Sequence, residues 1–82
     1  MSKIYLVVEE YVEDYNVETR ITPCATPELA TRTYEDRVEA DVVNFPDTIR
    51  CRNASYYANY EEGEYLENHS IIEIRELEVI DH

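Results

Sequence analysis

In the N-terminal part of the chain, aliphatic side chains recur at every second position. One face of residues 3–12, taken as an extended chain, carries Ile4, Leu6 and Val8. A period of two is typical of a β-strand. After a polar break at residues 13–16, residues 17–22 alternate in the same way. Two neighbouring strands joined by a four-residue polar loop predict a β-hairpin.

A helix is predicted next, beginning after Thr26. The Thr26 side chain can cap the first free backbone N–H groups, and Pro27 suits the first helical position. Apolar residues then recur at spacings of three and four, which is the period of an amphipathic helix. This stripe consists of Ala30, Tyr34, Val38, Val42 and Phe45. We expect the helix to end before Pro46 and its outer side to be net acidic.

The second half of the chain gives weaker signals. Residues 46–53 are predicted to be a connection, and residues 55–60 a tyrosine-rich strand. Residues 61–63 contain the one glycine turn, after which residues 64–67 are a candidate returning strand. In residues 70–80 the apolar positions change phase, which predicts a β-bulge near Arg75 and Glu76.

Together these elements predict an α+β fold of order ββαββ(β). A small antiparallel sheet would carry one amphipathic helix packed on one face, with the other face largely open to water. A chain of 82 residues favours one compact domain, residues 1–82, with a thin core. A thin core favours additional stabilisation from an oligomer or a partner.

The charge of the chain changes this picture, because 19 acidic residues against 7 basic ones give a formal net charge of −12. Acidic chains of this kind are commonly disordered, yet 44% of these residues are hydrophobic and the pattern is that of a folded domain. Like charges on a compact body repel one another and reduce its stability. The charge disfavours nucleic acid as a direct ligand, since Arg50 and Arg52 are the only local concentration of positive charge. It favours a partner whose own surface is basic.

No constellation of residues indicates a reaction. Adjacent acids fall in predicted turns and at strand ends, where water keeps both ionised, so we predict no catalytic residues and no enzyme. His69 and His82 have no nearby ligand residue, and no calcium-binding loop is spaced correctly, so neither a metal site nor a cofactor is expected. Cys24 and Cys51 are 27 residues apart without a CxxC motif, which favours two reduced thiols over the alternative of a disulfide.

The apolar run from Ile4 to Val8 is too short for a signal peptide or a membrane span. We therefore expect a soluble protein of the cytosol with no membrane partner.

The candidate partner-binding residues are acids and the tyrosines beside them. Tyr5, Tyr34 and either Tyr56 or Tyr57 are expected in the core. For the tyrosines beside acidic turns, a core position and a recognition surface are both open. The candidate residues are Glu9, Glu10, Glu13, Asp14, Glu28, Glu35, Glu39, Glu61, Glu62, Glu64, Tyr11, Tyr15, Tyr60 and Tyr65.

The chain resembles the phage-encoded DNA-mimic inhibitors, including many anti-CRISPR proteins. The resemblance covers the whole chain and rests on small size, strong acidity, one helix on a short antiparallel sheet, a single glycine and no catalytic motif. It implies a partner that is a subunit of a defence complex in the bacterial host cell. The acidic side chains would take the place of phosphates in the groove where that partner reads DNA or its PAM. The six arginines of this chain depart from the pattern.

The main alternative is a small structural or assembly module. It would form a homodimer through an edge strand or through the open face of the sheet. An enzyme ranks third, because no pocket is indicated by the sequence.

Overall fold

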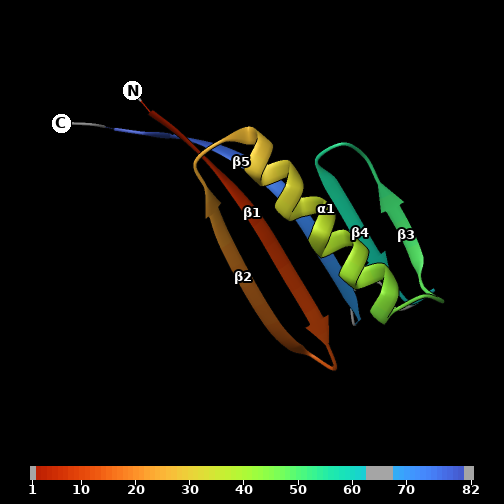
Figure 1. Cartoon of the computed structure of the whole chain (residues 1–82). Coiled ribbons are helices and arrows are strands. Elements are labelled where there is room, and N and C mark those ends of the chain that lie inside the picture. Colours follow the sequence, from red (N-terminus) through yellow and green to blue (C-terminus); the bar gives the residue numbers. More distant parts are fainter. Residues whose placement is uncertain (1, 63–67, 81–82) are drawn as a thin grey trace.

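The computed structural model of the chain describes residues 2–62 and 68–80. Within these residues, one helix packs on a five-stranded antiparallel sheet of order β2-β1-β5-β4-β3, which confirms the predicted α+β fold (Figure 1). The elements are β1 (Ser2–Glu13), β2 (Asn16–Cys24), α1 (Pro27–Asn44), β3 (Ile49–Arg52), β4 (Tyr56–Tyr60) and β5 (His69–Val79).

The two longest strands, β1 and β5, come from opposite ends of the chain and pair along their whole length. Their register runs from Ser2 opposite Val79 to Val12 opposite His69 without interruption. The predicted bulge near Arg75 and Glu76 is therefore wrong. The apolar phase changes in β5 because Ile72 and Ile74 face α1, whereas Leu77 and Val79 face the other side of the sheet.

The β1–β2 hairpin turns on two residues, Asp14 and Tyr15, rather than on the predicted four. Glu13 pairs with Asn16, and the φ angles of Asp14 and Tyr15 are 50° and 69°. Positive φ at both central residues defines a type I′ turn, whose twist matches that of the flanking strands. This turn fixes the register of the whole hairpin.

The connection predicted at residues 46–53 contains a further strand of the sheet, so that prediction is wrong in part. Residues Ile49–Arg52 form the edge strand β3 and pair with β4 from Ile49 opposite Tyr60 to Arg52 opposite Tyr57. The strand has only four residues, two of them arginines, and so it gave little hydrophobic signal. The candidate strand at 64–67 lies outside the described residues.

Helix α1 begins and ends as predicted. The Thr26 Oγ1 accepts a hydrogen bond of 3.2 Å from the backbone N–H of Leu29, and the helix ends at Asn44 with Phe45 as its C-cap. Ala30, Tyr34 and Val38 are buried against the sheet. Phe45 is half exposed, because it follows the last helical residue at the end of the sheet.

The core lies entirely between α1 and one face of the sheet. Its buried residues are Val7, Cys24, Ala30, Tyr34, Val38, Tyr57 and Ile72. The burial of Tyr34 and Tyr57 confirms two of the core tyrosines, and Tyr5 packs against the same cluster. Cys24 is a buried thiol on this face, whereas the thiol of Cys51 is exposed and lies on the opposite face.

Candidate functional site

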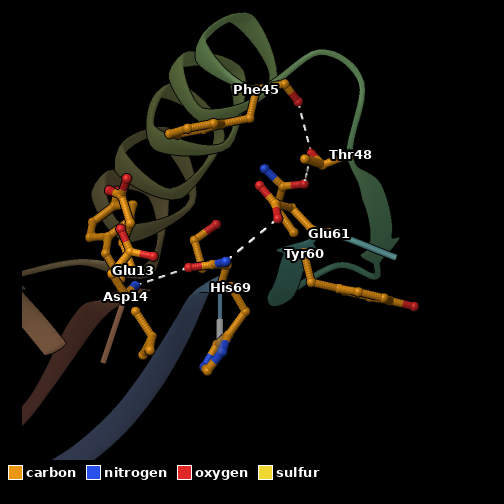
Figure 2. A pocket seen from close by; sticks show the side chains of 12 residues that line it. Glu13, Asp14, Phe45, Thr48, Tyr60, Glu61 and His69 are labelled. Atoms are coloured by element: carbon orange, nitrogen blue, oxygen red, sulfur yellow. Dashed lines mark hydrogen bonds between the residues drawn. The ribbon is translucent and has the colours of Figure 1, made fainter. Parts of the chain in front are cut away.

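A pocket of about 310 Å³ opens where the β1–β2 turn, the C-terminal end of α1 and the junction of β4 with β5 meet (Figure 2). Glu13 and Asp14 form one wall. Phe45 and Thr48 form a second wall, from the segment after α1. Tyr60, Glu61 and His69 contribute from β4 and β5. We call this region, with Tyr15, Glu18 and Glu62 beside it, the acidic end of the molecule.

The side chain of Asn68 holds the two acidic segments of this pocket together. Its Oδ1 accepts a 3.0 Å hydrogen bond from the backbone N–H of Asp14, and its Nδ2 donates to Glu61 Oε2 at 3.5 Å (Figure 2). On the other wall, Thr48 Oγ1 donates to the carbonyl of Phe45 at 2.8 Å and also contacts the Asn59 amide. The carboxylates of the turn are thus kept beside Glu61 by side chains from neighbouring elements.

The sequence-predicted candidates divide into two groups in space. Those brought together at the acidic end are Tyr11, Glu13, Asp14, Tyr15, Tyr60, Glu61 and Glu62. Glu28, Glu35 and Glu39 on α1 lie apart from it, and Glu10 lies on the open face of the sheet, beside the pocket residue His69. Glu35 is paired with Arg52, and Glu10 lies 3.7 Å from His69 Nε2. Glu64 and Tyr65 lie outside the described residues.

The assignment of Glu9 as a partner-binding residue is wrong, because its side chain is fully buried. Strand alternation places Glu9 on the face of β1 beneath α1, together with Val7. Its Oε1 accepts a 2.8 Å hydrogen bond from the hydroxyl of Tyr11, and its Oε2 lies 3.5 Å from Arg37 Nε. Burial raises the pKa of Tyr11, and the bond to Glu9 acts in the same direction, so this hydroxyl remains a donor.

A second buried carboxylate, Asp41, was missed by sequence reasoning. It lies on the inner side of α1 and accepts a 2.9 Å hydrogen bond from the hydroxyl of Ser70. Burial, together with the charge of Asp41, raises the pKa of Tyr57 to about 12. The spacing was a usable signal, since residue 41 follows Val38 by three positions and Tyr34 by seven, within the apolar stripe.

The buried polar groups form the floor of the acidic end. Tyr11, Asn59 and Ser70 line the pocket, and Tyr11 and Ser70 also reach Glu9 and Asp41 inside the molecule. No group of three metal-ligating side chains occurs among residues 2–62 and 68–80. Carboxylates beside aromatic rings attract cationic groups such as guanidinium and ammonium. The described groups therefore suit the binding of a positively charged partner.

Comparison with family models, with curated proteins and with solved structures finds no match to this chain. In the part of the chain that the structure describes, no helix is both long enough and apolar enough to cross a membrane.

Proposed function

We propose that the protein is a non-catalytic binding protein whose acidic end occupies a basic nucleic-acid-binding site on another protein. In this proposal the target is a DNA-reading subunit of a bacterial defence complex, and the site of action is the cytoplasm of the host cell. The observation that carries the proposal is the gathering of Glu13, Asp14 and Glu61 around one pocket. The carboxylates would accept hydrogen bonds from arginine or lysine side chains that otherwise bind phosphates.

The distribution of ion pairs supports this choice of surface. Within the described residues, the salt bridges join Lys3 to Glu76, Arg37 to Glu9, Arg52 to Glu35, His69 to Glu10 and Arg75 to Glu73. None of them involves Glu13, Asp14, Glu18 or Glu62. These salt bridges therefore leave the four acids uncompensated, and Arg50, which donates to the carbonyl of Phe45 on the opposite wall, is the nearby guanidinium that reduces the negative charge of the acidic end.

The orientation of α1 adds to the same field. Its C-terminal end, at Asn44 and Phe45, borders the pocket and carries the negative end of the helix dipole. No basic residue lies in the last turn of the helix itself, but Arg50 Nη2 from β3 donates a 2.8 Å hydrogen bond to the carbonyl of the C-cap residue Phe45 and offsets part of this field. A net charge of −12 also accelerates encounter with a basic partner over longer distances.

Competition with DNA on a purified, guide-loaded CRISPR effector tests the proposal. We expect the protein to displace target DNA and the apparent affinity to fall as salt is raised from about 50 to about 500 mM. The triple variant Glu13→Gln, Asp14→Asn, Glu61→Gln should bind at least about tenfold more weakly.

The matched control is the triple variant Glu28→Gln, Glu39→Gln, Glu78→Gln, which removes the same charge away from the pocket. It should retain most of the affinity, since it changes only long-range steering. Simultaneous binding of protein and DNA, binding that is indifferent to salt, or equal losses in both variants would each contradict the proposal.

A second candidate function, an assembly module, is supported by a different observation. The face of the sheet that α1 leaves uncovered is mostly apolar, which is unusual for a surface in contact with water.

A further inference from the structure

The face of the sheet opposite α1 is built from the most aliphatic positions of the chain. Because strand residues alternate in direction, the paired register assigns every second residue to this open face. Helix α1 packs only on the other face (Figure 1). The apolar residues of the open face are Ile4, Leu6, Val8, Val12, Val17, Ile21, Ile49, Tyr56, Tyr60, Ile71, Leu77 and Val79.

Charge on the open face is confined to a few residues, and one acid and one arginine among them form a salt bridge. Among the described strand residues, the register places only Glu10, His69, Glu73 and Arg75 there as titratable acids and bases. Arg75 Nη2 lies 2.5 Å from Glu73 Oε1, and His69 lies 3.7 Å from Glu10. The face is thus close to neutral on a chain whose net charge is −12.

The low net charge of the open face favours one kind of binding partner over another. A basic partner gains little from a face without excess negative charge, and it would be drawn to the acidic end instead. Two copies of the chain repel each other least when they meet through their neutral faces and keep their acids at the periphery. A second copy is also present whenever the protein is made, which suits a domain whose own core covers only one side of its sheet.

The size of the face agrees with what a stable dimer needs. At ~4.8 Å between strands and ~3.3 Å per residue, the described strands span roughly 650 Å² of flat area. Side chains standing on the sheet raise the accessible area above this value. A stable protein–protein interface buries about 800 Å² on each partner.

We propose that two copies of the chain pack open face against open face, as a two-fold symmetric sandwich with a helix on each outer side. The two sheets would lie ~10 Å apart with strands crossing at about 30°, as in other aligned sandwiches. Leu6, Val8 and Ile71, on the adjacent strands β1 and β5, form the apolar centre of each face. The Glu73–Arg75 pair enters the interface already neutralised. This inference does not rest on the proposed binding function. Val12, Tyr60 and His69 line the pocket and also lie on the open face, whereas the carboxylates that carry the binding proposal, Glu13, Asp14 and Glu61, are not among the open-face residues.

Mass measurement by light scattering after size exclusion tests the dimer. The wild type should have twice the chain mass of 9.7 kDa over a range of about 1 to 100 µM. Raising the salt should leave the dimer unchanged or tighten it, since salt screens the repulsion between like charges. Salt weakens the docking of the acidic end, so the two interactions are distinguishable.

The variant Ile21→Lys, Leu77→Lys places two charges on the open face. Both residues are about half exposed in one copy, at 56% and 48%, so the fold of the protomer should survive. We expect the dimer dissociation constant to rise by at least about 100-fold, since two charges would be buried without partners. Circular dichroism establishes that the fold is retained.

The matched control is Leu29→Lys, Val43→Lys, which adds the same charge at exposed apolar positions of α1. These residues are 46% and 71% exposed and lie away from the proposed interface, so the control should remain a dimer. A wild type that is monomeric throughout the range would overturn the proposal and leave the open face to a different protein. Equal dissociation of both lysine variants would overturn it as well.

Discussion

The covered and open faces of the sheet use alternate residues of the same strands, yet they differ in chemistry. In β1, Val7 and the charged Glu9 lie beneath α1, whereas Leu6 and Val8 face outward. The helix adds a second carboxylate, Asp41, to the covered side. The face of the sheet on the helix side therefore carries more charged residues than the open face does.

This difference shows that burial in this protein is decided by where the helix packs and not by which face is more hydrophobic. On the covered face, each buried carboxylate accepts one hydrogen bond, Glu9 from Tyr11 and Asp41 from Ser70, while Glu9 Oε2 and Asp41 Oδ1 accept none. Such groups need their partners, because an unsatisfied buried charge is costly. The open face has few groups of this kind, which suits a surface that packs against another apolar surface.

On the covered face, the largest loss of stability is expected from a substitution of Tyr34. This residue is fully buried and donates a 3.1 Å hydrogen bond to the carbonyl of Asn53. We expect Tyr34→Ala to lower the free energy of unfolding by about 4 kcal/mol, because it leaves a cavity beneath α1. Tyr34→Phe keeps the ring and should cost only about 1 kcal/mol for the lost hydrogen bond. Urea denaturation at one fixed protein concentration measures both values.

The matched substitution on the open face is Val17→Ala. In one copy Val17 is 66% exposed, so in the monomeric Ile21→Lys, Leu77→Lys background its truncation should cost about 0.5 kcal/mol or less. A cost for Tyr34→Ala that is no larger than the cost for Val17→Ala would contradict the assignment of the core to the helix side.

A tyrosine on the covered face should also make the free energy of unfolding fall at alkaline pH. Tyr57 has its pKa raised to about 12 by burial and by Asp41, whereas a tyrosine in the unfolded chain titrates near ~10. The folded chain thus holds this proton longer than the unfolded chain does. The stabilisation is complete below pH ~10 and is lost as the pH rises toward ~12, by at most about 1.4 kcal/mol per pH unit.

Urea denaturation between pH 8 and pH 12 gives this slope. Tyr57→Phe should reduce the slope, since the titrating group is removed while the ring remains. Tyr15→Phe is the control, because Tyr15 is 82% exposed and lies outside the core. The assignment to Tyr57 would be refuted by a slope that is the same in the wild type and in Tyr57→Phe.

Much of this fold could be predicted because its signals are local. The alternation in β1 and β2, the Thr26 cap and the apolar stripe of α1 each reflect the geometry of one element. Strand β3 and the straight register of β5 could not be predicted in this way. Strand β3 is a four-residue edge strand that pairs only with β4, and its composition gives no alternation. The register of β5 depends on its pairing with β1 from the other end of the chain, and its apolar residues on two faces give the same sequence pattern as a bulge.

The candidate site was predictable only in part. The acids of the two turns, such as Glu13 and Glu61, were identified as candidates, but their meeting in one pocket depends on β1, β4 and β5 lying side by side. Glu9 was misplaced because composition assigns a glutamate to the surface, whereas strand alternation fixes its side once Val7 is buried. Asp41 was missed for the same reason, because composition assigns an aspartate to the surface as well.

The contrast between the faces depends on the register of β1, since a slip by one residue would exchange Glu9 with Val8. That register is set by the turn at Asp14 and Tyr15, where Tyr15 has a φ of 69°. A residue with a side chain pays about 1 kcal/mol in this left-handed region, and glycine does not. Tyr15→Gly should therefore raise the free energy of unfolding by about 1 kcal/mol. Tyr15→Ala removes the same ring without relieving the backbone, so it should give no gain.

The same pair of variants connects the turn with the acidic end. A bulky, 82% exposed tyrosine at a position that favours glycine is a candidate for a functional role, because backbone strain persists where another requirement opposes it. In the DNA-competition measurement, Tyr15→Gly and Tyr15→Ala should both bind about threefold to tenfold more weakly, since both lose the aromatic contact. Greater stability with weaker binding in Tyr15→Gly would separate the two roles of the residue. Unchanged binding in both variants would limit Tyr15 to its place in the hairpin and leave recognition to the carboxylates around it.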